Sequence, residues 1–352
     1  LASLTGSLQS EERSVREAAA LALLNFSTSR QGTDMIVACS DAGAEDGCEA
    51  IRVMVNALIE PSGLVSLYLI TALGNICRYA EGTDLALAAG IVAKSVDMIK
   101  GAGPSDSEVR VGSPLSGLPE GTRLQSLNTV WNVGNHLRGK EELIEYGAVP
   151  AITATLSDTS RDVRRCASGA LMALSVDETG KSEIMEHSLE HLPRLLLDEY
   201  DSVRNNARIA IVHASENRMA RFQFVRECVQ TWPGSIAQSS ELVLRVFGTN
   251  AAEPLCELLA SPAEEGDDVV ERVCVTICDM IDEFGDKGND AMMSTLYVTE
   301  RLAGCLSAKR ETTRVASGDV LAKLCAKHKY AIKRLKTCGV GENCPENLVQ
   351  YL

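Results

Sequence analysis

Residues 187 to 191 have the types and the spacing of a zinc-hydrolase motif. The segment His187-Ser188-Leu189-Glu190-His191 reads HxxEH. In that pattern one helix presents both imidazoles to zinc while the glutamate activates a water molecule. Residues 183–189, however, match the junction between the last helix of one repeat and the first helix of the next in the repeat pattern described below. A helix break near Ser188 would point the two histidines apart, so zinc hydrolysis is kept only as a remote alternative.

A second segment, residues 134–140, has the letters GxxxxGK of a phosphate-binding loop. In such a loop, backbone N–H groups surround the phosphates and the lysine reaches the outer ones. The next residue is Glu141 rather than a serine or threonine that would hold magnesium, and the segment leaves a helix instead of following a buried strand. These departures argue against nucleotide chemistry at this segment.

The twelve cysteines run from Cys39 to Cys344 without any CxxC pair. Cys274 and Cys278 stand at i and i+4, but no second pair matches them as a metal site would require. We therefore expect buried, reduced thiols in a cytoplasmic or nuclear protein. We also expect no enzyme, with no catalytic residue, no metal site and no cofactor.

Composition indicates closely packed helices and a protein partner. Of the 352 residues, 45% are hydrophobic but only 4% are aromatic, and the formal net charge is -14. Nucleic-acid binding needs clustered lysines and arginines that displace counterions, so we expect no nucleic acid. The acidity favours a partner with a basic segment, and the alternative is that it only keeps the protein soluble. No apolar run approaches the roughly 20 residues that a membrane span needs.

Apolar residues recur at i, i+4, i+8 and i+11, which is one stripe of a 3.6-residue period with a small residue near its centre. The stripes are Val15-Ala19-Leu23-Phe26, Val163-Ala167-Leu171-Leu174, Val203-Ala207-Ile211-Ala214 and Val270-Cys274-Cys278-Ile281. A small central residue lets a neighbouring helix approach closely, so each unit buries its apolar face against the next one. The pattern therefore predicts stacked helical repeats.

Glycine and proline mark the ends of the predicted helices. Gly147 is placed as a helix C-cap, and Pro150 stands in the first turn of the following helix. Similar breaks are expected at residues 41–43 and 88–90. The stretch from 101 to 121, rich in Gly, Pro and Ser, is predicted to be an insertion, and residues near 231–262 are predicted to form an irregular region.

Three segments, residues 15–27, 72–76 and 131–135, resemble the third helix of armadillo repeats, as in importin-α and β-catenin-like proteins. In that family each repeat has three helices and about 40 residues, and the third helices line a concave groove. The resemblance implies an all-α, right-handed alpha-alpha superhelix, an armadillo-type solenoid of about seven repeats with some irregular units. We expect it to span residues 1–352 as a single domain.

The resemblance also implies a binding groove on the third helices. Trp131 and Asn135 look like the pair with which the import adaptors hold an extended peptide: asparagine bonds the peptide backbone, and tryptophan contacts the stems of its lysines and arginines. The position of Asn25 aligns with Asn75, Asn135, Ala173, His213, Met280 and Lys323. The predicted groove residues are Asn25, Asn75, Arg78, Trp131, Asn135, Arg138 and His213. The alternative is that each asparagine only ties down its own helix end and the turn between repeats.

A concentrated basic run lies near the end of the sequence. It consists of Lys323, Lys327, Lys329, Lys333, Arg334 and Lys336. A solvated helix face that complements the helix dipole is the favoured interpretation, and a site for an anionic partner is the alternative.

The leading functional hypothesis is an adaptor or scaffold whose concave groove binds a segment of a partner protein. One alternative is a regulator of a small GTPase or chaperone, of the exchange-factor kind. Another is a structural subunit of a large assembly. Neither the partner nor the oligomeric state follows from the sequence.

Overall fold

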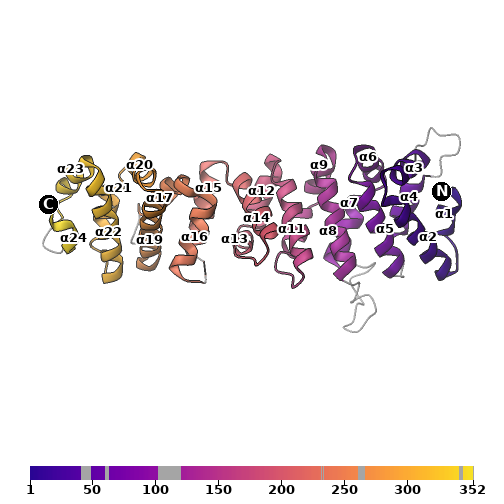
Figure 1. The fold of residues 1–352 in the computed structure, drawn as a ribbon, viewed down its shortest axis with the longest axis horizontal. Coiled ribbons are helices and arrows are strands. Elements are labelled where there is room, and N and C mark those ends of the chain that lie inside the picture. The colour runs from indigo at the N-terminus through magenta and orange to yellow at the C-terminus, as the bar shows by residue number, and fades with distance from the viewer. Residues whose placement is uncertain are drawn as a thin grey trace. The chain divides into compact units, whose positions relative to one another are not determined.

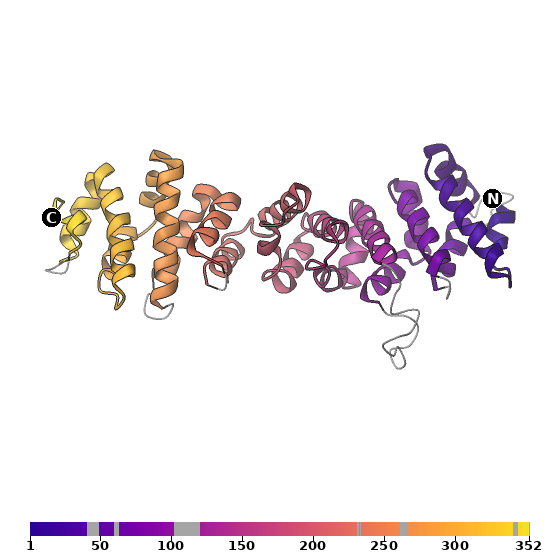
Figure 2. The ribbon, with the colours of Figure 1, turned by 60° about the horizontal axis from the view of Figure 1, so that its bottom comes forward.

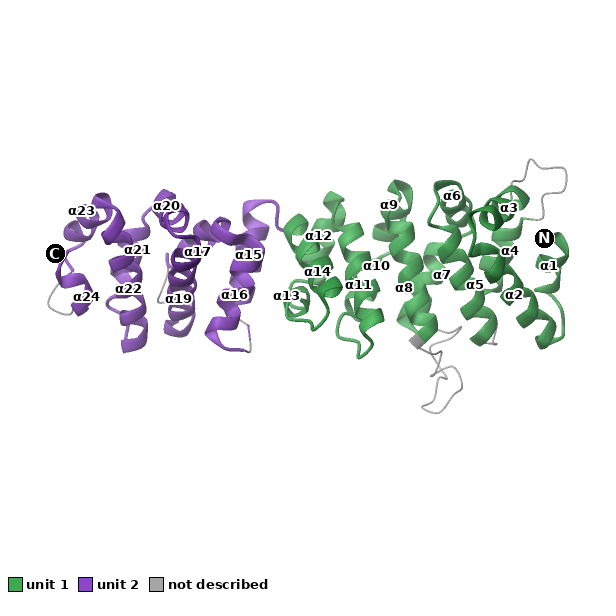
Figure 3. Ribbon diagram, viewed as in Figure 1, with its two compact units in different colours: residues 1–214 green, residues 215–352 purple. Residues whose placement is uncertain are grey.

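The computed structural model describes residues 1–40, 49–59, 63–101, 120–230, 232, 234–260, 266–340 and 344–351, and no strand occurs among them. Helices follow one another along the whole described chain (Figure 1). The chain divides into two compact units, residues 1–214 and 215–352 (Figure 3). None of the described helices is long and apolar enough to cross a bilayer.

Unit 1 is a stack built on five long helices. These are α2 (Arg13–Ser27), α5 (Gly63–Ile76), α8 (Glu120–Gly134), α11 (Arg161–Leu174) and α14 (Asp201–Ala214). Each packs against the next in chain order, and both ribbon views show the succession (Figures 1 and 2). Shorter helices connect them: α1 (Ala2–Ser7), α3 (Arg30–Ser40), α4 (Ala50–Asn56), η1 (Ala57–Ile59), α6 (Ala80–Ala88), α7 (Ile91–Lys100), α9 (Leu137–Glu145), α10 (Ala148–Thr153), α12 (Glu178–His187) and α13 (Leu192–Leu195). A repeat is therefore a first helix, a second helix and a long third helix.

Unit 2 repeats this organisation on three long helices, α16 (Ile236–Phe247), α19 (Asp267–Phe284) and α22 (Glu311–Lys327). Helix α16 packs against α19, and α19 packs against α22. The shorter helices are α15 (Arg218–Gln230), η2 (Gly248–Ala251), α17 (Ala252–Leu258), α20 (Asp286–Ser294), α21 (Val298–Cys305), α23 (Lys329–Thr337) and α24 (Glu346–Val349). Only α15 precedes α16 in its repeat, which has two helices rather than three.

A glycine in the first helix fixes how closely that helix crosses the end of the preceding long helix. A Cβ atom on Gly82 would lie 2.5 Å from the Ile76 carbonyl oxygen, and one on Gly139 would lie 2.4 Å from that of Val133. Only glycine fits such a contact, because the obstacle is backbone that cannot turn aside. The glycines of this kind in unit 1 are Gly32, Gly82, Gly139 and Gly180. They give an unambiguous register for comparing the repeats.

An arginine early in the long helices ties down the loop before it. In α11 the Arg164 guanidinium donates hydrogen bonds to the carbonyls of Asp158 and Thr159, both at 3.0 Å. Arg16, Arg204 and Arg314 donate to carbonyls at the corresponding positions of their own loops. These bonds satisfy loop carbonyls and restrain the turns into α2, α11, α14 and α22. This recurrent arginine is a feature that the sequence analysis missed.

The turn between first and second helices places a residue in the left-handed region. Gly90 has φ 82° and Gly147 has φ 73°, as expected for the predicted breaks at residues 88–90 and at Gly147. In unit 2, Tyr297 occupies this turn with φ 61°. A tyrosine there is strained, since its Cβ crowds the backbone.

Three sequence predictions concern segments that the structure describes only in part. The break at residues 41–43 lies outside the described residues, as does the predicted insertion apart from residues 101, 120 and 121. Of the predicted irregular region, residues 231, 233 and 261–262 lie outside them. The single-domain organisation stays a prediction.

Candidate functional site

The glycine register changes which residue of α8 corresponds to Asn75. Counting back seven residues from Gly82 gives Asn75, and the same count from Gly139 gives Asn132 rather than Asn135. The predicted equivalence of Asn135 is therefore wrong. It followed from the Gly-Asn pair that residues 134 and 135 share with residues 74 and 75, but α8 ends at Gly134 and Asn135 lies in the turn that follows.

Three polar side chains on the long helices of unit 1 bond to the end of the preceding long helix. Asn75 Nδ2 donates to Ser27 Oγ at 3.1 Å. Asn132 Nδ2 donates to the Gly74 carbonyl at 2.9 Å. His213 Nδ1 lies 3.0 Å from Ser175 Oγ. These residues hold the stack together, which is close to the structural role that the sequence analysis kept as its alternative.

Helix α11 differs, because Ala173 occupies the corresponding position and has no polar group to donate. There Trp131 of α8 contributes to the contact between the two long helices. A Cβ on Gly169 would lie 2.6 Å from the indole Cε2, so the ring rests on the glycine backbone. The Arg165 guanidinium carbon lies 5.9 Å from the ring centroid, and Arg165 Nε is 3.4 Å from the Asp162 carboxylate. Trp131 is half-buried.

Several asparagine side chains on or just after the long helices of unit 1 have hydrogen-bonding capacity to spare. Asn128, one turn before Asn132 and half-buried, has no side-chain partner among the described residues. Asn25 and Asn135 are exposed, and in the described part of the chain their side chains likewise bond to nothing. Asn128 was not among the predicted groove residues. The glycine register would have found it, since it places Asn128 level with Thr71 of α5.

The two predicted arginines lie in different surroundings. Arg78 is exposed and follows the end of α5, and its side chain has no ion-pair partner within the described ranges. Arg138 belongs to the first helix α9, where it forms an ion pair with Asp84 of α6 at 3.3 Å. The prediction that Arg138 lies with the groove residues on the third helices is therefore wrong, because the chain has already turned into the next helix.

The zinc-like motif spans a break between helices. Helix α12 ends at His187, and His191 is the residue before α13, so no single helix presents both imidazoles. The break near Ser188 was predicted, but it separates the first and second helices of one repeat rather than two repeats. His187 Nε2 instead lies 3.4 Å from Glu183, one turn earlier on α12.

The cysteines in the described residues are all free thiols. Burial raises the pKa of the Cys77 and Cys228 thiols to about 12 and that of Cys325 to about 11. The thiolate is the nucleophile and the metal ligand, so these groups are inert near neutral pH. They serve as small core residues.

The basic run near the C-terminal end forms ion pairs with preceding helices of unit 2. Lys323 Nζ lies 2.5 Å from Asp282, Lys327 Nζ lies 2.9 Å from Asp286, and Arg334 pairs with Glu300. Such exposed pairs each contribute little. Together they connect α22 and α23 to α19, α20 and α21, which accounts for half of the run without an anionic partner.

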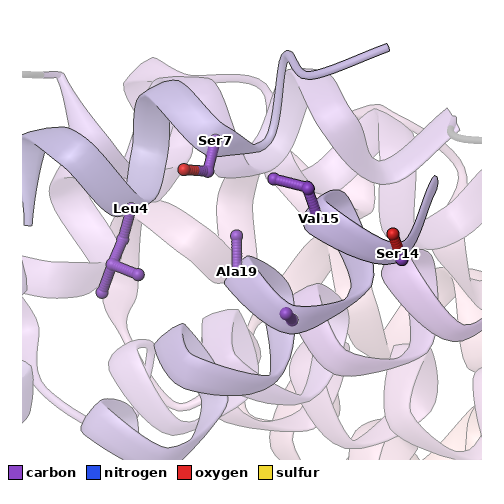
Figure 4. Close-up of a pocket in the computed structure, with 6 residues that line it drawn as sticks. Leu4, Ser7, Ser14, Val15 and Ala19 are labelled. Atoms are coloured by element: carbon purple, nitrogen blue, oxygen red, sulfur yellow. The ribbon is translucent and has the colours of Figure 1, made fainter. Parts of the chain in front are cut away.

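A pocket of about 320 Å³ lies between α1 and α2 (Figure 4). Its lining consists of Leu4, Ser7, Ser14, Val15, Ala18 and Ala19. Val15 is 36% exposed, whereas Val65, Val163 and Val203, at the corresponding places of later long helices, are fully buried. The pocket is therefore part of the stacking face of the first long helix, and no titratable side chain lines it.

No protein-family model and no curated protein sequence matches the chain. Solved structures match its fold. An engineered protein at 18% identity matches over 96% of this chain and 82% of its own, with a TM-score of 0.52. A designed armadillo repeat protein in complex with a (KR)4 peptide matches at 18% identity over 70% of this chain and 99% of its own, with a TM-score of 0.54. A structure concerning the interaction between cadherin and beta-catenin matches at 15% identity over 97% of this chain and 64% of its own, also with a TM-score of 0.54. The chain thus has the armadillo-like repeat fold, an all-α solenoid, as its sequence predicts.

Proposed function

We propose that the chain is a protein-interaction scaffold, and that a segment of a partner protein binds along the long helices of unit 1 around Trp131. The observation that carries this proposal is the half-buried indole of Trp131, one helical turn from Asn128, whose amide has no partner among the described residues. An aromatic ring next to free hydrogen-bonding groups is the usual centre of a binding surface, because the ring supplies contact area and the amides fix the orientation.

The fold supports this proposal. Stacked repeats present a long continuous surface to which every repeat contributes the same positions, and extended segments bind along such surfaces. Among the structural neighbours, one designed armadillo repeat protein is bound to a (KR)4 peptide, and another structure concerns the interaction of beta-catenin with cadherin. A peptide-like partner for this chain follows by analogy.

The residues divide into a centre and a surround. Trp131, Asn128 and Asn132 form the centre, because they share α8 and contact both α5 and α11. Asn132 uses only one amide hydrogen in its bond to Gly74, so its second donor and its oxygen remain for a partner backbone. The surround consists of Asn25, Asn75, Arg78, Asn135 and His213. Arg138 lies on the first helix α9, so it contacts a partner only if the partner extends onto that helix.

The setting of the protein follows from its charge and its thiols. A net charge of -14 favours a basic segment at long range. Free buried cysteines fit a reducing compartment, so we place the adaptor in the cytoplasm or nucleus.

Affinity capture with the wild-type chain and with a Trp131→Ala, Asn128→Ala variant tests the proposal. We expect the captured partner to bind the variant at least about tenfold more weakly, since a central tryptophan carries 2 kcal/mol or more in many interfaces. Tyr330→Ala, which removes a 60% exposed aromatic ring in unit 2, is the control and should bind normally. Helical content and melting temperature must be checked for both variants. Equal binding by all three proteins would refute the proposed site.

A further inference from the structure

Charge is segregated between the two kinds of helix in unit 1. The first helices α6, α9 and α12 carry eight acidic side chains against three basic ones. The acidic residues are Glu81, Asp84, Glu141, Glu142, Glu145, Glu178, Glu183 and Glu186. The long helices α5, α8, α11 and α14 have the opposite balance, with six arginines against three acidic residues. The net negative charge of the protein therefore does not describe the surface on which Trp131 lies.

Three of those six arginines form ion pairs or hydrogen bonds with loop residues. Arg123 pairs with Asp158, and Arg164 and Arg204 bond to loop carbonyls. The other three are Arg161, Arg165 and Arg208. Arg161 stacks on Tyr200 at 4.8 Å. Arg208 is exposed and contacts only the neutral amide of Asn205 in the described structure, at 3.4 Å. Arg78 adds a further exposed guanidinium past the end of α5.

The position of Arg165 determines which charged side chains of a partner can bind beside Trp131. Its guanidinium already lies over the Trp131 ring at 5.9 Å, where a lysine or arginine of a basic peptide would have to stack. A second cation at that place would be repelled by Arg165 and would find no free ring face on the α11 side. A carboxylate, in contrast, would meet the planar donor fork that Arg165 presents.

Helix α14 packs beside α11 and carries the exposed Arg208. Asn206 Nδ2 donates to the Arg165 carbonyl at 3.2 Å, which fixes α14 beside this part of α11. Asn205 lies next to it in the chain, and Arg208 contacts Asn205. On α11 and α14 the acidic residues are Asp162, which already contacts Arg165, and Asp201, which pairs with Arg204.

We infer that the Trp131 face binds an acidic segment of a protein, with its carboxylates at Arg165 and Arg208 and its backbone at Asn128 and Asn132. This inference rests on the proposed function and names the partner's chemistry. The net charge of the protein favours a basic partner, whereas this face favours an acidic one. A bound segment contacts the local charges, while the net charge acts over longer distances. Nucleic acid is disfavoured because the neighbouring first helices are acidic.

Fluorescence anisotropy with two labelled peptides, (Asp-Glu)4 and (Lys-Arg)4, tests the inference on the full chain. We expect (Asp-Glu)4 to bind, and to bind more weakly as the salt concentration rises. Its Kd should increase at least about tenfold with Arg165→Glu, Arg208→Glu and less with Arg165→Gln. Arg194→Glu makes one such charge reversal on α13, where the side chain is exposed, and should leave the Kd within about twofold.

Trp131→Ala separates the charge inference from the proposed function. If (Lys-Arg)4 binds in a Trp131-dependent way and binds more tightly after Arg165→Glu, the face is a binding site but the acidic partner is wrong. If neither peptide's binding depends on Trp131, both proposals fall. The inference of an acidic protein segment would also be overturned if an eight-nucleotide single-stranded DNA bound more tightly than (Asp-Glu)4. The same holds if Arg194→Glu weakened (Asp-Glu)4 binding as much as the substitutions at Arg165 and Arg208 do. Melting temperatures confirm that each variant is folded.

Discussion

The indole of Trp131 in α8 rests on Gly169 in α11, at the one step between the long helices of unit 1 where an alanine, Ala173, replaces the polar tie. A Cβ at residue 169 would fall 2.6 Å from the ring. Trp131 therefore has two roles. It packs against the next repeat, and the part of its side chain that stays exposed belongs to the candidate site.

Gly169→Ala should displace the indole. We expect a loss of about 1 to 3 kcal/mol in unfolding free energy, as for other overpacked contacts. Urea unfolding measures this loss, and the emission of the displaced ring should shift to the red. In a double-mutant cycle, Gly169→Ala should cost little in a Trp131→Ala background, because the obstacle is gone. Additive losses would show that the two residues do not interact.

The arginine that ties the loop before α11 also reaches the next repeat. Arg164 Nε donates to Asp198 at 2.6 Å, and the two side chains are only 14% and 6% exposed. This hydrogen bond raises the pKa of Arg164, so its guanidinium stays charged. Asp198→Ala should cost about 3 kcal/mol, because it leaves a buried guanidinium without its partner.

The matched control for that variant is Asp84→Ala. It removes the partner of Arg138 in a pair whose side chains are 57% and 68% exposed. Water screens such a pair, so the loss should be at most about 1 kcal/mol. Chemical denaturation of both variants compares the two sites, and equal losses would contradict the account of the Arg164 tie.

Tyr297 stands where Gly90 and Gly147 stand in other repeats, with φ 61°. Its side chain is 60% exposed and has few contacts to lose. Tyr297→Gly should therefore raise the unfolding free energy by about 1 kcal/mol as the left-handed strain is relieved. Gly147→Ala should lower it by a similar amount. Thermal unfolding distinguishes the two signs, and destabilisation by Tyr297→Gly would be the contrary result.

The buried thiols make stability fall in alkaline solution. The pKa of Cys77 and Cys228 is raised from 9.0 to about 12 in the folded protein, so the unfolded chain releases these protons first. The stabilisation is complete below about pH 9 and is lost as the pH rises toward 12. When the pH is raised from about 8 to about 10.5, deprotonation of each thiol in the unfolded chain should lower the free energy of unfolding by about 1 to 2 kcal/mol. Urea unfolding at both values checks this, and Cys77→Ala should flatten the dependence. An unchanged slope in that variant would contradict the assignment.

The repeat architecture could be predicted because it depends on short-range patterns. The stripe from Val163 to Leu174 reports directly on a buried helix face, and Gly147 reports on a turn. The candidate site was harder to place, because its register depends on where α8 ends. Asn132 and Asn135 lie one turn apart, and only the close contact between Gly139 and Val133 separates them.

Other features could not be predicted because they join residues from different repeats. Nothing in the local sequence indicates that Trp131 lies on Gly169, or that Arg165 covers one side of its ring. The net charge was similarly uninformative about the face. The net charge adds the negative charges of the first helices to the positive charges of the long helices. A partner would contact these two kinds of helix separately.

The fluorescence of Trp131 tests the central claim most directly. Trp232 is the other tryptophan in the chain, so a Trp232→Phe variant leaves Trp131 as the reporter. When a captured partner or the (Asp-Glu)4 peptide is added at saturating concentration, the account predicts a shift in emission and protection from acrylamide quenching. An unchanged spectrum and unchanged quenching, under conditions where anisotropy shows full binding, would contradict it.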